Sequence, residues 1–458
     1  FTGVGTIVKT GLGTVTWNGA ATFNMSSGAL IDVQEGTFTA ADSGNDIWTN
    51  NKADLNIAAG ATFNGAEAGS VANGGIFVDS ITGAGRIEVG YSDGPSLPYA
   101  NLLTFGVDNG SGTFSGVLAD KEIGDPDAHG SFTKNGTGTQ TLTGTSTATG
   151  TMTVNNGTLV LGHATDTLGS AMAVTVDGAA AILSIGGNSD TVGTVSLKNG
   201  GSITGSGGTL TGSSYAVQSG GVSAKLGGSG IALTKSTSGT VTLSGANTYT
   251  GATTVNAGSL IINGNQSAAT GAVTVNNSGT RLMGNGTVGG ATTINAGAIH
   301  APGTSVGTQT FSSSLTYANA SIFEWDLTAS LDADSADGDD GVAGTDFDNV
   351  SVTGNIDVGT TGTVFKVVFG SSVLTDITTS NAFWNTPYIT QVWNMATIFG
   401  KAFNSGAFQS VETSTDVSAY GSFTINGTSL TWTAVPEPTS ALAGLLLGAG
   451  LLRRRRRS

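Results

Sequence analysis

The stretch TKSTSGTVTLSGANTYTGATTVNAGSLIING, residues 234–264, contains the pattern that decides the fold. Polar and apolar residues alternate along TVTL and again along SLII, and Asn or Gly residues follow each run. Alternation of period two that ends in Asn and Gly is typical of short β-strands joined by turns. This stretch therefore predicts strands and not helices.

Both halves of this stretch recur elsewhere in the chain. The first half returns as VKTGLGTVTWNG at residues 8–19 and as TKNGTGTQTLTG at residues 133–144, and the second half returns as GTMTVNNGTLVLG at residues 150–162. Weaker copies of the second half continue between and after the strong ones. Their turn glycines are Gly157, Gly178, Gly200, Gly220, Gly258, Gly279 and Gly297. Within each of the groups 157–220 and 258–297 the glycines recur at a nearly constant interval of about twenty residues, which is the length of one short structural repeat.

A repeat this short cannot enclose a hydrophobic core by itself, so consecutive copies must stack and bury their apolar faces together. We therefore predict an all-β protein with a parallel β-helix over residues 1–304, in which inward Val, Ile and Leu side chains stack and outward Thr and Asn side chains form polar ladders. An array of β-sandwiches is the alternative, because Lys134 and Lys235 are separated by about 100 residues, the length of a sandwich domain.

The composition favours the same class and argues against several functions. Only 10% of the residues are charged, which leaves little from which to build long amphipathic helices, and the absence of Cys excludes disulfides and thiolate metal sites. The net charge of −15 predicts repulsion from nucleic acid and from anionic lipid headgroups. We expect no nucleic-acid partner.

The repeats resemble the autotransporter-associated β-strand repeat of bacterial passenger domains. Residues 234–264 are most similar, residues 133–162 are similar, and residues 8–30 agree in outline. The resemblance implies a right-handed β-helix passenger. The sequence departs from autotransporters in one respect, since no segment resembles their C-terminal membrane β-barrel of alternating strands.

From about residue 305 the strands become longer and more aromatic, and we expect residues 305–434 to form a β-rich cap. This region contains an acidic segment at residues 332–348. Closely spaced carboxylates can bind Ca²⁺, but the spacing here is not that of an EF-hand loop, so a solvated acidic loop is the favoured interpretation and Ca²⁺ the alternative. We expect no other cofactor. The candidate ligands are Asp332, Asp334, Asp337, Asp339 and Asp340.

The C-terminal residues 435–458 have three parts: a VPEP turn, an apolar segment at residues 439–452, and a run of arginines. This order resembles the PEP-CTERM sorting signal of Gram-negative bacteria. The resemblance implies a transient inner-membrane helix, cleavage by an exosortase and delivery to the cell envelope or beyond. The matching residues are Val435, Pro436, Glu437, Pro438, Arg453, Arg454, Arg455, Arg456 and Arg457. At the other end FTGVGTIVKT shows no secretory signal, which predicts that the chain begins inside a longer precursor.

Other polar residues give weaker signals for chemistry. Lys9, Lys134 and Lys235 align in the repeats. We expect their stems to cover the coil edge while the ammonium groups stay in water, and the alternative is an equidistant basic stripe. His163 and His300 are expected to be surface imidazoles. The acids of the regular coils are expected at unrelated rung positions, with a single arginine, Arg281, nearby; they are Asp166, Asp177 and Asp190. The tryptophans of the cap are expected to be buried, and the alternative is stacking on sugars; they are Trp325, Trp384, Trp393 and Trp432.

Together these features predict a non-enzymatic, exported protein of the cell surface or extracellular matrix, with an adhesin-like or structural function. Its expected partners are the exosortase, extracellular polysaccharide and other surface proteins. The alternative is a β-helix polysaccharide lyase or hydrolase, which would need paired carboxylates, or carboxylates beside an Arg or Lys, on adjacent rungs.

Overall fold

The computed structural model describes residues 1–17, 21–40, 46–65, 75–90, 102–121, 129–331, 341–379, 381–386 and 390–435. The chain divides into two compact units. Unit 1 comprises Phe1–Thr253 and Ala268–Gly271, and unit 2 comprises Thr254–Ser267 and Ala272–Ser458. Strand β30 (Thr253–Val255) spans the division.

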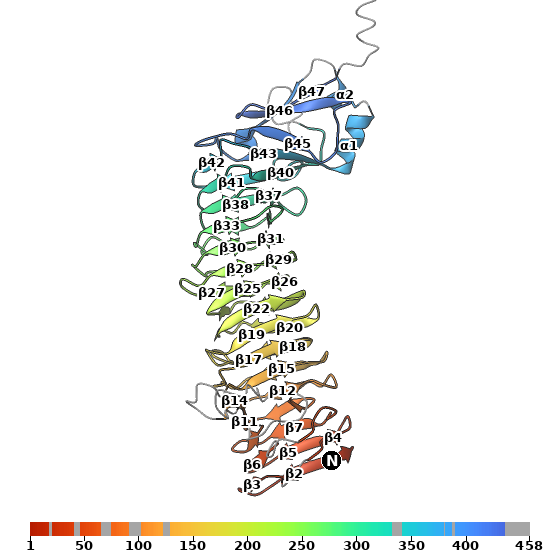
Figure 1. Cartoon of the computed structure of the whole chain (residues 1–458), viewed down its shortest axis with the longest axis vertical. Coiled ribbons are helices and arrows are strands. Elements are labelled where there is room, and N and C mark those ends of the chain that lie inside the picture. Colours follow the sequence, from red (N-terminus) through yellow and green to blue (C-terminus); the bar gives the residue numbers. More distant parts are fainter. Residues whose placement is uncertain are drawn as a thin grey trace, which may run out of the picture. The chain divides into compact units, whose positions relative to one another are not determined.

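Unit 1 is a parallel β-helix whose coils follow one another in chain order (Figure 1). Its first sheet contains β2 (Thr6–Lys9), β5 (Leu30–Val33), β7 (Asp54–Ile57), β10 (Ile81–Gly83), β13 (Gly112–Phe114), β16 (Thr139–Leu142), β18 (Gly157–Leu161), β20 (Ala181–Gly186), β23 (Gly201–Gly205), β26 (Gly220–Val222) and β29 (Thr240–Leu243). Its second sheet contains β9 (Ile76–Phe77), β12 (Leu102–Phe105), β15 (Ser131–Lys134), β17 (Thr151–Val154), β19 (Ala173–Asp177), β22 (Thr194–Lys198), β25 (Ser214–Val217) and β28 (Leu233–Lys235).

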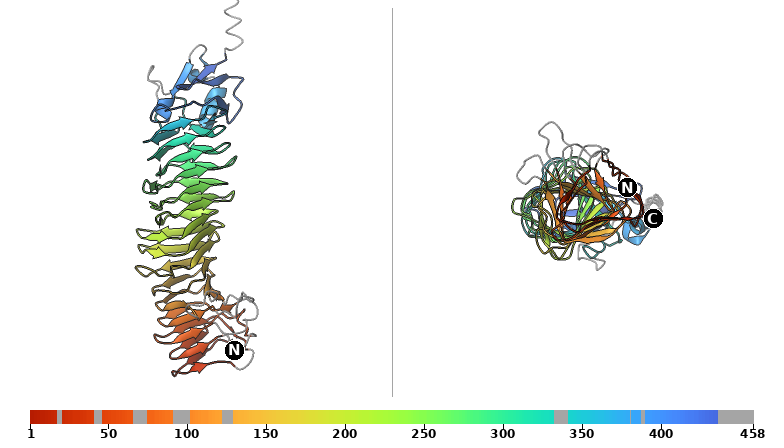
Figure 2. Two further views of the ribbon diagram at one scale, coloured as in Figure 1. Left: turned by 60° about the vertical axis from the view of Figure 1, so that its left-hand side comes forward. Right: turned by 90° about the horizontal axis from the view of Figure 1, so that it is seen from below.

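Shorter strands form the remaining faces of unit 1. One group is β3 (Thr14–Val15), β6 (Thr37–Thr39), β8 (Thr62–Asn64), β11 (Arg86–Val89) and β14 (Val117–Asp120). A second group is β21 (Asp190–Thr191), β24 (Thr209–Thr211) and β27 (Lys225–Gly227), and a pair is formed by β1 (Thr2–Gly3) and β4 (Asn24–Met25). Figure 2 shows the coils of unit 1 from another side, again stacked in chain order.

The strand register confirms the predicted repeat length at the start of unit 2, where Ser259 pairs with Arg281 and Arg281 with Ile299, and in the middle of unit 1. There, residues that pair from coil to coil along the second sheet recur at close to the predicted interval; they are Phe132, Met152, Val174, Val195, Tyr215 and Leu233. Nearer the N-terminus the step is longer, since Phe132 pairs on its other side with Leu103. Each strand therefore pairs in parallel with a strand one coil away. Because sandwich strands pair through hairpins, the sandwich alternative is wrong.

Inward side chains of successive coils stack directly on one another, as predicted. Val154, Val176, Leu197 and Val217 occupy corresponding positions of the second sheet, and all four are buried. Burial of one such side chain stabilises a fold by roughly 1.5–3 kcal/mol. The core of unit 1 is thus a set of parallel apolar stacks, and each coil depends on its neighbours for burial.

The turn glycines that the repeat analysis singled out all have positive φ angles. The values lie between +63° at Gly157 and +134° at Gly178. Side chains other than hydrogen are strained in this region, which explains why glycine recurs at each corner. Handedness stays a prediction.

Unit 2 also contains parallel strands that pair from coil to coil. One sheet contains β31 (Ser259–Ile262), β34 (Arg281–Gly284), β37 (Ile299–Pro302), β40 (Ile322–Leu327), β43 (Val364–Phe369) and β45 (Ser410–Thr413). A second contains β33 (Val273–Val275), β36 (Thr292–Ile294), β39 (Leu315–Tyr317) and β42 (Ile356–Val358), and a third contains β32 (Asn265–Gln266), β35 (Thr287–Val288), β38 (Thr308–Phe311) and β41 (Asn349–Val352). Parallel pairing thus continues past residue 305, and the predicted domain boundary there stays a prediction.

The last part of unit 2 departs from the coil pattern. Strands β44 (Thr390–Asn394), β46 (Gly421–Ile425) and β47 (Ser429–Ala434) form an antiparallel sheet in the order β44-β47-β46. This part also contains the helices α1 (Ser371–Thr378), α2 (Ala382–Asn385) and α3 (Met395–Ile398). No helix in the described part of the chain is long and apolar enough to cross a membrane. The apolar segment 439–452 lies outside the described residues.

Candidate functional site

The aligned lysines of the repeats lie inside the coils and not on their surface. Lys134 and Lys235 occupy inward positions of the second sheet, where Lys134 stacks between Phe105 and Val154. Both lysines are fully buried. Lys9 is 6% exposed and lies on the first sheet, so the three lysines do not form one stripe.

Backbone carbonyl groups surround each ammonium at a corner of the coil. Lys134 Nζ donates to the carbonyl oxygens of Gly136 at 2.9 Å and of Asn156, one coil further on, at 3.3 Å. Lys9 Nζ donates to Glu35 O on the next coil at 2.9 Å, and Lys235 Nζ donates to Thr237 O. We call these arrangements the lysine corners. Each contains an inward lysine, and those of Lys9 and Lys134 link a turn to the next coil.

The lysine corners correct the expectation that these ammonium groups stay in water. Burial lowers the pKa of the Lys134 ammonium to about 8 and also lowers the pKa of Lys235. The expectation failed because a long stem can pass through an apolar stack and reach the carbonyl groups at the corner. These lysines close turns and present no basic surface.

Polar ladders run along the outside of the coils, as predicted. In unit 1 the amide of Asn155 donates to Asn135 at 3.0 Å, and in unit 2 Asn276 donates to Asn256 at 3.0 Å and accepts from Asn295 at 2.7 Å. Hydroxyl groups behave in the same way, as between Thr151 and Ser131 at 3.1 Å. Such ladders leave rows of amide and hydroxyl groups on the outer faces.

Two of the three acids of the regular coils lie at matching positions, contrary to expectation. Thr165 bridges to Ser189 in parallel, which places Asp166 beside Asp190 on the neighbouring coil. Burial and the charge of Asp166 raise the pKa of Asp190 to about 7. Asp190 Oδ2 accepts the N–H of Leu168 at 3.1 Å, so this buried carboxyl caps a turn.

His300 is buried and not at the surface as expected, whereas His163 lies in a bend and is partly exposed. His300 Nδ1 is 2.6 Å from the hydroxyl of Tyr317, and Nε2 is 2.9 Å from Gln309 Oε1. Burial lowers the pKa of His300 to about 4. The sequence contains no signal that distinguishes the core from the surface for this single polar residue in the short strand β37.

An ionic group in unit 2 joins Glu324 to Lys366 on the adjacent rung and to Arg281 two rungs away on the other side. Glu324 on β40 bonds to the guanidinium of Arg281 on β34 and to Lys366 Nζ on β43, the latter at 2.9 Å. The Glu324 side chain is 7% exposed, and its partners are about a third exposed. The oxygens of this carboxylate are therefore engaged by cations of the same chain.

A buried carboxyl, Asp348, lies beside this strand. It accepts the N–H of Gly307 at 2.9 Å and of Asp326 at 2.8 Å, and burial raises its pKa to about 9. The acidic segment predicted at residues 332–348 thus ends inside the core.

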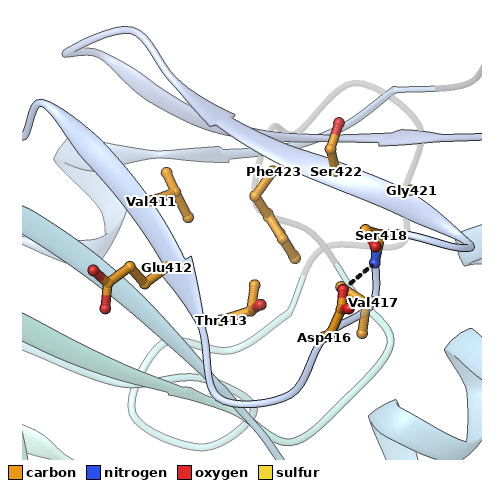
Figure 3. Close-up of a pocket in the computed structure, with 9 residues that line it drawn as sticks. All are labelled: Val411, Glu412, Thr413, Asp416, Val417, Ser418, Gly421, Ser422 and Phe423. Atoms are coloured by element: carbon orange, nitrogen blue, oxygen red, sulfur yellow. Dashed lines mark hydrogen bonds between the residues drawn. The ribbon is translucent and has the colours of Figure 1, made fainter.

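The tryptophans of the cap are buried, as predicted, and none of them is available for stacking on sugars. Trp325, Trp384, Trp393 and Trp432 are each fully buried. Phe423, by contrast, does line a hollow, which lies between strands β45 and β46 (Figure 3). The sequence indicates a strand that contains Phe423. It does not show toward which neighbouring strand the side chain projects, because it does not identify that neighbour.

The predicted sorting and calcium residues fall almost entirely outside the described part of the chain. Val435, the last described residue, is half exposed, and the rest of the signal, from Pro436 to Arg457, lies outside the described residues. The candidate ligands from Asp332 to Asp340 are not covered either. Among the described residues, no three His, Asp or Glu side chains are placed to hold a metal ion.

Comparison with known proteins agrees with the repeat analysis. Two segments, residues 132–161 and 233–262, match the passenger-associated-transport-repeat family. Each match begins just before a lysine corner and covers the strands that follow it. A search of curated proteins gives no match to the chain. The repeats indicate an exported, passenger-type protein with a surface or structural role.

Proposed function

We propose that this protein is an exported component of the cell surface or extracellular matrix of a Gram-negative bacterium, with an adhesin-like, non-enzymatic function. The observation that carries the proposal is the parallel β-helix of unit 1, together with the passenger-type repeats within it.

The outer faces of the coils support adhesion through many weak contacts. Thr153, Thr175 and Ser196 stand at corresponding, partly exposed outward positions on three successive strands of the second sheet. Strands in a sheet are about 4.8 Å apart, so such a row offers a hydroxyl group at each step. Repeated weak contacts raise the total affinity without a single deep pocket.

We further propose that residues 435–458 direct sorting, with transient insertion of residues 439–452 in the inner membrane and cleavage by an exosortase. The test compares the location of the full chain in its native host with that of a chain ending at Ala434. We expect the full chain at the surface without peptides beyond about Pro438 in mass spectrometry. An intact arginine tail on surface protein would refute processing.

Calcium binding by the segment from Asp332 to Asp340 stays a proposal. It is tested by thermal unfolding of the full chain with Ca²⁺ and with a chelator. A midpoint that does not depend on Ca²⁺ supports the solvated loop.

A polysaccharide lyase or hydrolase is the second candidate, and the ionic group favours it, because Glu324 and Lys366 pair on adjacent rungs and Arg281 reaches Glu324 from two rungs away. We assign this group a structural role since its carboxylate is paired on both sides. If Glu324→Gln abolished degradation of a matrix polysaccharide while the fold was retained, the enzymatic function would be preferred.

A further inference from the structure

A hollow of about 420 Å³ lies in unit 2 between strands β45 and β46, near the end of the described chain (Figure 3). This volume is in the range of small-molecule sites. Its walls come from β45, from the connection that follows it and from β46. All of these elements belong to unit 2, and none belongs to the predicted repeats.

The floor of the hollow is a rigid aromatic ring. Phe423 projects into the space between the two strands (Figure 3). Behind it, the ring packs against Trp432, with centroids 4.9 Å apart, and against Trp393, with centroids 5.7 Å apart. Because both tryptophans are fully buried, the ring is held in place before any ligand arrives. Phe423 thus offers a flat, preorganised apolar surface.

Hydrogen-bonding groups stand around this floor. Thr413 and Asp416 lie on the side of the hollow that Phe423 faces, whereas the carboxylate of Glu412 points away from it (Figure 3). The N–H of Ser418 donates to Asp416 Oδ1 at 2.9 Å and, with the Ser418 side chain, lowers the pKa of Asp416. Asp416 is exposed, so a donor from solution can reach its carboxylate.

A flat ring beside a carboxylate and hydroxyl groups matches the chemistry of a pyranose. One face of such a sugar carries C–H groups that pack on an aromatic ring, and its hydroxyl groups donate to a carboxylate. An ionised Asp416 in a chain of net charge −15 disfavours anionic sugars.

We propose that this hollow binds one uncharged hexose unit of an extracellular polysaccharide, with the sugar ring on Phe423 and a sugar hydroxyl donating to Asp416. The proposal rests on the proposed surface function and specifies a ligand for it. Thr413 and Ser418 supply further hydrogen bonds at the rim. Binding of a single hexose is weak, with a dissociation constant of about 1–10 mM for a ligand of this size.

The test is ligand-observed saturation-transfer NMR on the purified full chain with the methyl glycosides of glucose, galactose and mannose. We expect saturable binding of at least one glycoside by the unmodified chain. Phe423→Leu removes the flat ring but keeps apolar volume, and Asp416→Asn removes the charge but keeps the shape. Each variant is expected to weaken binding about tenfold. The matched control is Asp357→Asn, since Asp357 lies in unit 2 outside the hollow and bonds to Ser405.

Three results would overturn the proposal. The first is that no uncharged glycoside binds at about 50 mM, a concentration well above the dissociation constant expected of such a ligand. The others are tighter binding of methyl glucuronoside than of methyl glucoside, and binding that Asp416→Asn does not change. Circular dichroism checks that each variant is folded, and if Phe423→Leu unfolds, Asp416→Asn and Thr413→Val provide the decision. Surface location is measured separately. A surface protein that binds no sugar contradicts only this inference, whereas a sugar-binding protein that stays inside the cell contradicts the proposed function.

Discussion

Two sets of coils bury their apolar side chains in different ways. They are the even coils of unit 1, residues 131–235, and the wide coils of unit 2, residues 299–413. In the even coils the step from strand to strand is nearly constant along the second sheet. In the wide coils the step lengthens along the chain, from Ile299 pairing with Ile322 to Val364 pairing with Ser410. A constant coil length lets one type of side chain stack repeatedly.

The wide coils must accommodate extra chain, and they do so with aromatic side chains and buried polar groups. Phe323, for example, packs against Phe365 and Phe399, with centroids 5.2 Å and 4.8 Å apart. His300 and Asp348 are buried with specific partners, whereas an even coil buries a lysine that reaches carbonyl groups at its corner. The comparison shows that even coils are stabilised by repetition and wide coils by individual contacts.

Removal of a lysine corner gives the largest expected effect on the even coils. Lys134→Ala deletes the stem from the core and leaves carbonyl groups at the corner without their cationic donor, so we expect unfolding free energy to fall by about 3–4 kcal/mol. Lys198→Ala is the matched control, since Lys198 is partly exposed, and should change the unfolding free energy by less than about 0.5 kcal/mol. Urea unfolding followed by circular dichroism measures both. Equal effects would mean that the corner contributes nothing.

His300 provides a pH test of the wide coils. The pKa of His300 is about 4 in the folded chain and about 6.5 when unfolded, so the folded state favours the neutral imidazole. Stability from this group is complete above about pH 6.5 and is lost as the pH falls toward about 4, by about 3 kcal/mol in all. Unfolding of the wild type and of His300→Gln is compared at neutral pH and near the folded pKa, with His163→Gln as the control. If His300→Gln lost as much stability on acidification as the control, this explanation would fail.

The ionic group of the wide coils is expected to contribute less. Glu324→Gln leaves the charges of Arg281 and Lys366 without their shared carboxylate, and both are partly exposed to water, so we expect a loss of about 1–2 kcal/mol. The loss should be smaller at high salt because ions screen exposed charges. Asp357→Asn, which changes a partly exposed carboxylate on another sheet of unit 2, is the control. A salt-independent loss would point to packing instead of charge.

The asparagine ladders give the smallest effect and compare the two units directly. Asn276 joins two ladder bonds in unit 2, and Asn155 joins one in unit 1. We expect Asn276→Ala to cost about 1 kcal/mol and Asn155→Ala about half of that. Thermal unfolding of the two variants makes the comparison, and the reverse order would contradict it.

The β-helix could be predicted from the sequence because alternation, turn glycines and a constant step are all local signals. Gly157 and Gly178, for example, could be placed in turns from their spacing and from the residues beside them. The inward position of Lys134 could not be predicted. A lysine normally indicates the exposed face of a strand, but its long stem can also cross the core and bring the ammonium group to the corner. The pairing of Asp166 with Asp190 was missed for a related reason, since it depends on exact register between coils of unequal loops.

The candidate sugar site was also out of reach of sequence reasoning. From the sequence, Phe423 is one residue of an aromatic strand, and the tryptophans are the more obvious candidates for stacking. Whether an aromatic side chain is buried or lines a hollow depends on which strand lies beside it, and β45 follows the longest step of the wide coils. The neighbouring strands of the wide coils cannot be predicted from the sequence, because the lengths of these coils do not follow a repeat.

Cysteine cross-linking tests the stacked parallel coils most directly, since the chain has no cysteine of its own. Thr153 pairs with Thr175 on the next coil, and Thr175 with Ser196 on the one after that. Neighbouring strands lie about 4.8 Å apart, within the range of a disulfide, whereas residues two coils apart exceed about 7 Å. The double variant Thr153→Cys/Thr175→Cys should oxidise to an intramolecular disulfide, and Thr153→Cys/Ser196→Cys should not. Equal cross-linking of both pairs, or of neither, would contradict the β-helix.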